Sequence, residues 1–266
     1  MTEWTKLNEA ITEWFTVVQQ KLRTSDQKPL EIKQKSDRTD LVTNVDQEIE
    51  AYFVKQIKTT FPDSKILGEE GDKDNGLTTY PGLVWVIDPV DGTMNYVKQR
   101  DHFASMLAVY ENGHEKLGYI LDVTANKLYW GGPECGVYCN DEKLAPPKDL
   151  PLSEGLLDIS GRMLVEDYCH VKKAVKASLG IRVYGSAGLG FIHVLTGKTL
   201  GYLSHLHPWD YAAGKILAHV QGLVVETIDG RPFDMLSSND VLVATKNAEK
   251  DILKQLDRPN VWNCGD

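Results

Sequence analysis

The stretch Trp85-Val-Ile-Asp-Pro-Val-Asp-Gly-Thr-Met-Asn95 joins an apolar run, two aspartates and an Asp-Gly turn. Its first three residues favour a buried strand, and Pro89 predicts that this strand ends at Asp88, because proline cannot donate to a sheet ladder. The turn Asp91-Gly92 leads into residues 93–98, which predict a short helix whose first N–H groups point back toward the aspartates. We therefore expect both acids where a strand ends and a helix begins.

Paired acids at this place have a chemical implication. Two carboxylates at one strand end repel each other unless a cation lies between them, and oxygen-only ligands suit Mg²⁺ or a similar hard cation. The N–H groups at the start of a helix suit a phosphate. A metal ion and a phosphate at one point indicate phosphate ester chemistry. A surface turn with two solvated acids is the alternative that this stretch alone leaves open.

The whole chain has the composition of a globular protein. Its 266 residues, 42% of them hydrophobic and 25% charged, suffice for one large α/β domain or two small ones. The net charge of −9 argues against a nucleic acid or a membrane surface as partner. Four cysteines without a Cys-Xaa-Xaa-Cys pair indicate reduced thiols, and no signal peptide or membrane span is expected. These features predict a cytoplasmic protein.

The segments before the central stretch predict helices and a further acidic turn. Residues 3–23 carry apolar side chains at helical spacing, which predicts an amphipathic helix. Thr43 or Asn44 is expected to cap a second helix, with Asp46 in its first turn. A short strand then runs into Gly68-Glu69-Glu70-Gly71, which places two more acids at a strand end beside glycines.

The segments after it predict two halves of different character. Residues 103–110, 116–122 and 127–130 favour an antiparallel sheet. Three prolines in residues 145–151 then predict a boundary. We expect an N-terminal α+β half, residues 1–148, and a C-terminal α/β half, residues 149–266, within one catalytic unit. In the second half, strands at 156–159, 181–184, 199–203, 223–227 and 241–244 are expected to alternate with helices at 165–179, from 186, at 209–221 and at 248–256.

Four motifs in this order and spacing resemble the inositol monophosphatase family. They are Asp40-Leu-Val-Thr-Asn-Val-Asp46, Gly68-Glu69-Glu70, Asp88-Pro-Val-Asp-Gly-Thr93 and Trp209-Asp210-Tyr-Ala-Ala-Gly214. The resemblance extends from about residue 35 to residue 214. It implies an α/β (α+β) fold, specifically a five-layered α/β/α/β/α sandwich. It also implies Mg²⁺-dependent hydrolysis of a phosphate monoester by metal-activated water attack, inhibition by lithium, and a homodimer.

The resemblance also assigns metal ligands. Glu69, Asp88 and the Val90 backbone carbonyl would hold the first Mg²⁺. Asp88, Asp91 and Asp210 would hold the second, with Asp88 as the bridge. Glu69 would assist a third, weaker ion. Two divalent ions placed in this way can clamp the attacking and the leaving oxygen and offset the charge of the phosphate.

The remaining assignments concern catalysis and substrate binding. Thr93 would orient the attacking water, with Asp46 accepting its hydroxyl proton and Glu69 helping through the water or its metal. The Gly92 and Thr93 N–H groups would bind the phosphate. The resemblance places Ser186 in a segment that contacts the alcohol portion of the substrate, but Ser186 can also be interpreted as a plain helix N-cap. The implied substrate-binding residues are Asp91, Gly92, Thr93, Gly185, Ser186, Ala187 and Asp210.

One position departs from the family pattern. Where well-known inositol-processing members carry a glutamate seven residues before the aspartate of Trp-Asp, this chain has Leu203, which we expect in the alcohol pocket. Loss of a hydroxyl acceptor changes discrimination between alcohols. The substrate stays open among inositol monophosphate or a related small sugar or nucleotide phosphate, the 2′-phosphate of NADP(H), fructose 1,6-bisphosphate and adenosine bisphosphate. A regulatory scaffold that binds a protein partner is the alternative to an enzyme.

Overall fold

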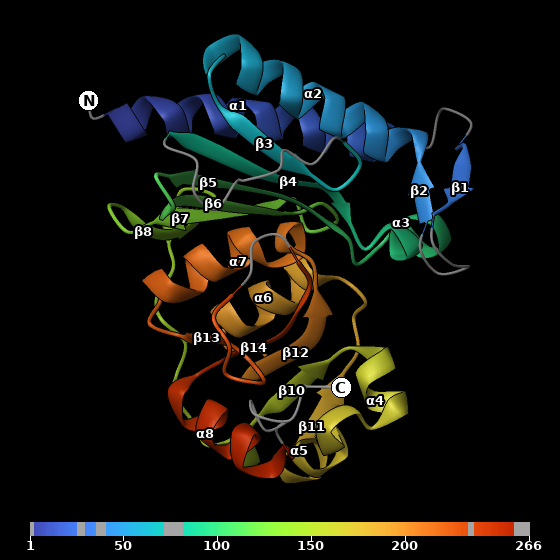
Figure 1. Cartoon of the computed structure of the whole chain (residues 1–266), viewed down its shortest axis with the longest axis vertical. Coiled ribbons are helices and arrows are strands. Elements are labelled where there is room, and N and C mark those ends of the chain that lie inside the picture. Colours follow the sequence, from blue (N-terminus) through green and yellow to red (C-terminus); the bar gives the residue numbers. More distant parts are fainter. Residues whose placement is uncertain (1–2, 26–29, 36–40, 72–81, 234–236, 258–266) are drawn as a thin grey trace.

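Helices and sheets alternate through the molecule as layers (Figure 1). The computed structural model describes residues 3–25, 30–35, 41–71, 82–233 and 237–257. Asp40, the first residue of the motif that ends at Asp46, lies outside the described residues. The α-helices are α1 (Glu3–Thr24), α2 (Asn44–Thr60), α3 (Thr93–Gln99), α4 (Gly161–Glu166), α5 (Val171–Ala177), α6 (Ala187–Leu195), α7 (Pro208–Val220) and α8 (Lys246–Gln255).

The larger sheet is built almost entirely from strands that follow one another in the chain. Its seven strands pair in chain order, with β3 parallel to β4 and every later pair antiparallel. A separate hairpin, β1 (Ile32–Gln34) with β2 (Leu41–Thr43), precedes α2. The strands of the sheet are β3 (Lys65–Gly68), β4 (Leu83–Asp91), β5 (Ala104–Glu111), β6 (His114–Asp122), β7 (Lys127–Gly132), β8 (Gly136–Cys139) and β9 (Glu142–Lys143).

The smaller sheet has a mixed topology. Its order is β11-β10-β12-β14-β13, in which β10 pairs in parallel with β11 and β12, and β14 pairs antiparallel with β12 and β13. The alternation expected from the sequence therefore produces a parallel arrangement in only part of this sheet. Its strands are β10 (Leu156–Ile159), β11 (Gly180–Arg182), β12 (Gly201–Leu206), β13 (Val224–Thr227) and β14 (Asn239–Ala244).

Three apolar cores hold the layers together. One joins α1 and α2 to the outer face of the larger sheet through residues such as Phe15, Phe53 and Trp85. A second places α6 and α7 between the two sheets, and a third lies between the smaller sheet and α5 and α8. Figure 1 shows the resulting order from the α1/α2 layer to the α8 end. The predicted five-layered α/β/α/β/α sandwich is confirmed.

The predicted end of the central strand is wrong. Strand β4 continues past Asp88 to Asp91, because Pro89 lies in a bulge where two residues of β4 stand opposite one residue of β5. Side chains alternate between the faces of a strand, so residues three apart would point to opposite faces without the extra residue. The bulge therefore brings Asp88 and Asp91 to the same side of the sheet.

The prediction of a single helix over residues 165–179 is also wrong. The chain forms α4, a short 3₁₀ turn over Tyr168–His170, and α5. Asp167, Cys169 and His170 have positive φ values of 52°, 49° and 57°, which no right-handed helix accommodates. Both short helices keep apolar residues toward the core, so their spacing resembles that of one longer helix.

The proposed two halves correspond to where each sheet lies in the chain. The larger sheet ends at Lys143 and the smaller sheet begins at Leu156. Helices α6 and α7 from the second half pack on strands of the first. The division at residues 148 and 149 stays a prediction. None of the described helices combines the length and apolar character that a membrane crossing requires.

Candidate active site

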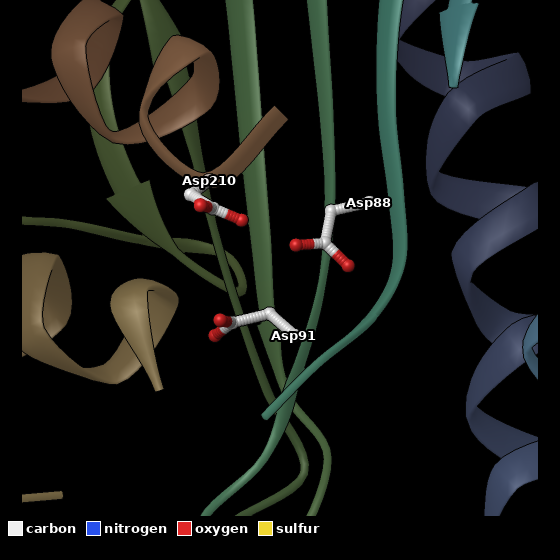
Figure 2. Close-up of side chains that lie close together, drawn as sticks. All are labelled: Asp88, Asp91 and Asp210. Carbon is white, nitrogen blue, oxygen red and sulfur yellow. The ribbon is translucent and has the colours of Figure 1, made fainter. Parts of the chain in front are cut away.

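Three aspartates converge in the space between the sheets. Asp88 and Asp91 extend from β4 and Asp210 from the first turn of α7, and Figure 2 shows the side chains of Asp88 and Asp210 pointing toward each other with Asp91 beside them. One oxygen of each lies within 4.8 Å of the others. The His207 N–H donates to Asp210 Oδ2 at 2.7 Å, which fixes this carboxylate at the helix start. The predicted metal ligands from both halves are thus brought together.

The electrostatics of this cluster favour a cation. Burial raises the pKa of Asp88 well above its usual range, and the charges of Glu69, Asp91 and Asp210 raise it further. Burial and neighbouring acids likewise raise the pKa of Asp210. Asp88 Oδ1 is buried and has no hydrogen-bond partner among the described residues. An all-oxygen donor set with an orphaned carboxylate oxygen fits a hard divalent cation such as Mg²⁺.

Glu69 lies next to this cluster and forms an ion pair with a lysine. It follows the last residue of β3, the strand beside β4, and shares a hydrogen bond with Asp88. Lys35 Nζ contacts Glu69 Oε1 at 2.8 Å and also pairs with Glu70. Burial lowers the pKa of Lys35, but the two carboxylates outweigh burial and raise it overall. This ammonium group shows that a cation is accommodated at the Glu69 end of the site.

Thr93 and Asp46 form the pair that the sequence predicts. Thr93 Oγ1 lies 3.1 Å from Asp46 Oδ1 and 2.9 Å from the Val90 carbonyl, so its hydroxyl is oriented by two acceptors. Asp46 Oδ2 accepts the Thr43 N–H at 3.0 Å within the predicted helix cap. Burial raises the pKa of Asp46, although these hydrogen bonds oppose the shift. The start of α2 therefore fixes the hydroxyl of Thr93.

The start of α6 wraps around Asp91. The Ala187 N–H donates to Asp91 Oδ1 and the Gly188 N–H to Asp91 Oδ2, each at 2.8 Å, and the Ser186 hydroxyl also donates to this carboxylate. Ser186 Oγ accepts the Leu189 N–H at 3.3 Å, so the interpretation of Ser186 as a helix N-cap is confirmed. The predicted substrate residues Ser186 and Ala187 are therefore in direct contact with Asp91, one of the three clustered aspartates.

Glycines allow two chain segments to meet beside the cluster. Gly92 and Gly185 have φ values of +84° and +71°, a region that other residues rarely adopt. A Cβ on Gly92 would lie 3.2 Å from the Gly185 carbonyl oxygen and 3.2 Å from the Ser186 Cβ. The predicted phosphate turn and the predicted substrate loop are thus in contact.

The prediction that Leu203 lies in the alcohol pocket is wrong. Its side chain is fully buried in the core beneath the smaller sheet, because neighbouring residues of β12 point to opposite faces. Tyr202 and Ser204 face the layer of α6 and α7 instead. Asp158, which pairs with Tyr202 across β10 and β12, lies on that same face. The polar side chains of Tyr202, Ser204 and Asp158, and not Leu203, therefore border this side of the site.

Sequence reasoning missed Asn95, Glu50, Gly188 and Asp158. Asn95 is in the quoted stretch but was given no role. Glu50 falls one turn after Asp46, a spacing that places both on one helix face. Gly188 and Asp158 carry no motif in this chain, and only the fold brings them to the site.

This arrangement defines a metal-dependent phosphatase. Residues 1–259 match the inositol monophosphatase family. The chain belongs to this family. It is 39% identical over 260 residues to an inositol-1-monophosphatase of Bacillus subtilis (strain 168), which covers 96% of this chain and 98% of that protein.

Two other relatives show how the family varies. A fructose-1,6-bisphosphatase/inositol-1-monophosphatase of Thermotoga maritima is 29% identical over 215 residues, covering 78% of this chain and 79% of that protein. A solved structure of an IMPase/NADP phosphatase complexed with Mg²⁺ and phosphate has a TM-score of 0.87 at 28% identity, with 96% of both chains covered. The predicted family and the predicted class, a phosphoric monoester hydrolase, are confirmed.

Proposed function

We propose that this enzyme hydrolyses inositol monophosphate or a related small sugar or nucleotide phosphate with the help of two or three Mg²⁺ ions. The convergence of Asp88, Asp91 and Asp210 within 4.8 Å supports this proposal most strongly. The names of the similar proteins support the substrate range, since they include inositol-1-phosphate, fructose-1,6-bisphosphate and NADP phosphatases.

The acids have distinct assignments in this proposal. Asp88, Asp91 and Asp210 would hold one ion, and Asp88, Glu69 and the Val90 carbonyl the other. When bound, such ions offset the charge of the phosphate and act as Lewis acids toward its oxygens. Filling the site would also replace the Lys35 contact with Glu69.

The reaction places water on phosphorus while the ester P–O bond breaks and the alcohol leaves. Thr93 would orient this water, because its hydroxyl is fixed between Asp46 and the Val90 carbonyl. The Gly92 and Thr93 N–H groups would bind the phosphate. Gly185, Ser186 and Ala187 would contact the alcohol.

A homodimer is proposed from three exposed apolar side chains near one edge of the smaller sheet. Val165, Leu179 and Val183 are 79%, 69% and 49% exposed. They lie in α4 and on either side of β11, the edge strand of the smaller sheet. Exposed apolar side chains beside a sheet edge favour pairing with another copy. Lithium sensitivity and a cytoplasmic location stay predictions.

Phosphate release with Mg²⁺ and with EDTA tests the proposal. The substrates are inositol 1-phosphate, NADP⁺, fructose 1,6-bisphosphate and adenosine 3′,5′-bisphosphate. We expect Mg²⁺-dependent release from at least one of them, and the preferred ester identifies the alcohol. Folded, Mg²⁺-bound protein that released phosphate from none would contradict this substrate range and favour the scaffold role.

A further inference from the structure

Glu50 is a buried acid for which the proposed reaction has no use. It is 6% exposed, although glutamate is seldom buried without partners. It follows Asp46 by four residues in α2, so both carboxylates lie on the same buried face of this helix. Asp46 contacts Thr93, whereas Glu50 reaches a different part of the site.

The carboxylate of Glu50 fills the turn that carries Glu69 and Glu70. Glu50 Oε2 accepts the Glu70 N–H at 2.8 Å, and the Gly71 N–H also donates to this carboxylate. One side chain thus binds two successive backbone N–H groups. A carboxylate can do this because both of its oxygens accept, whereas an amide has one acceptor.

The two glycines of this turn leave room for Glu50. A Cβ on Gly68 would lie 2.7 Å from both Glu50 oxygens, and a Cβ on Gly71 would lie 2.5 Å from Oε1. Atoms do not approach this closely without displacement. The Gly-Glu-Glu-Gly sequence therefore matches the carboxylate that sits against its backbone.

The side chains of the turn reach the metal cluster while its backbone is held by Glu50. Glu69 contacts Asp88 and Lys35, and Glu70 contacts Lys35. We propose that Glu50 is a positioning residue, which fixes the turn over residues 68–71 so that Glu69 is directed at the metal site. This inference rests on the proposed function, since Glu69 is assigned as a metal ligand there. Partners of metal ligands commonly change metal affinity by about 10- to 100-fold.

The first test is Glu50→Gln, with Glu48→Gln as the matched control. Glu48 lies on the same helix but is exposed and pairs with Lys21 at the surface. Calorimetric titration of Mg²⁺ into the metal-free protein measures affinity without any substrate. We expect Glu50→Gln to weaken Mg²⁺ binding about tenfold, because one backbone N–H loses its acceptor. Glu48→Gln is expected to bind as the wild type does.

A double-mutant cycle tests the same contact without relying on one variant. Gly71→Ala is expected to weaken Mg²⁺ binding, because its methyl group displaces the Glu50 carboxylate. In a Glu50→Ala background the same Gly71→Ala change is expected to have no further effect on Mg²⁺ affinity. If Glu50→Gln did not fold, Gly71→Ala alone would carry the test.

The outcomes separate this inference from the proposed function. Wild-type Mg²⁺ affinity in folded Glu50→Gln or Gly71→Ala would overturn the inference, even if thermal stability fell. A wild-type protein that binds Mg²⁺ but cleaves no tested ester would contradict the proposed substrates. The Mg²⁺ titrations of the Glu50 and Gly71 variants would still test the inference. A wild-type protein that binds no Mg²⁺ would overturn both.

Discussion

Asn95 Nδ2 donates to the Tyr184 carbonyl oxygen at 2.6 Å and thereby ties the predicted phosphate turn to the predicted substrate loop. The same amide lies 2.8 Å from the His102 carbonyl and 3.4 Å from that of Gly185. Asn95 is 9% exposed, so these contacts are shielded from water. A side chain of α3 thus fixes the backbone that precedes Ser186.

Asn95→Asp is expected to loosen the substrate loop, because a carboxylate cannot donate to the three carbonyl groups. Losing such a buried hydrogen bond costs on the order of 1–3 kcal/mol. We expect KM for the preferred substrate to rise about tenfold or more, and KM for p-nitrophenyl phosphate to change less. Asn126→Asp, in an exposed turn, is the control. Equal effects on both esters would contradict a role in recognising the alcohol.

Thr93→Ala is expected to lower kcat about 100-fold while Mg²⁺ affinity stays within about threefold of the wild type. The reason is that the hydroxyl between Asp46 and Val90 is lost, whereas the carboxylates remain. Thr93→Ser keeps the hydroxyl and is expected to retain most activity. Steady-state kinetics and Mg²⁺ titration measure the two quantities. A matching loss of metal binding in Thr93→Ala would refute the water-orienting role.

Asp88→Asn is expected to abolish Mg²⁺-dependent turnover without unfolding the protein. The metal-free variant is expected to melt at or above the wild-type temperature, because removing one buried charge relieves repulsion from Glu69, Asp91 and Asp210. Mg²⁺ is expected to raise the melting temperature of the wild type and not that of the variant. Thermal unfolding with Mg²⁺ and with EDTA measures this. Normal turnover in Asp88→Asn would disprove the bridging assignment.

Asp158 is expected to make stability depend on pH. Burial raises its pKa to about 7, although the Ile159 and Tyr184 N–H groups donate to it. The folded state therefore keeps a proton that the unfolded state loses near pH 4, and the free energy of unfolding falls as pH rises toward 7. We expect the free energy of unfolding of the wild type, minus that of Asp158→Asn, to drop by about 2 kcal/mol between pH 5 and pH 8. Urea unfolding at both pH values measures it, and an unchanged difference would contradict the shift.

Leu179→Glu is expected to convert a dimer into monomers. A charge at this apolar position would have to lose its water in an interface. Ile32→Glu, at an exposed apolar position in β1, is the control. Sedimentation equilibrium measures the mass. A wild-type monomer, or a dimer that survives Leu179→Glu, would contradict this edge of the smaller sheet as the interface.

Periodic apolar patterns predicted most of the fold. The first helix, the cap at Thr43 and strand β10 were found where expected, because each depends on residues that are close together in the chain. The break between α4 and α5 was missed because the left-handed residues Asp167, Cys169 and His170 are not encoded by any apolar period. Strand β4 was predicted too short because proline is tolerated at a bulge.

The acids of the site could be found from motifs, but their surroundings could not. The contacts of Asp91 with the start of α6 join residues far apart in the chain, and no local pattern predicts them. Leu203 was misplaced because its facing depends on the register of β12, which a motif spacing does not give. Glu50 has the clearest signal, its spacing from Asp46, and only the fold shows what it contacts.

Asp210 comes from a different layer than Asp88 and Asp91, and this arrangement affects the rates of folding and unfolding. The strand that carries two of the acids pairs with strands that are close to it in sequence, whereas α7 must dock from the other half. Without a cation, that docking brings like charges together. With the proposed ions bound, separating α7 from β4 must first release an ion. Mg²⁺ is therefore expected to slow unfolding far more than it speeds folding, and so to extend the lifetime of the native enzyme.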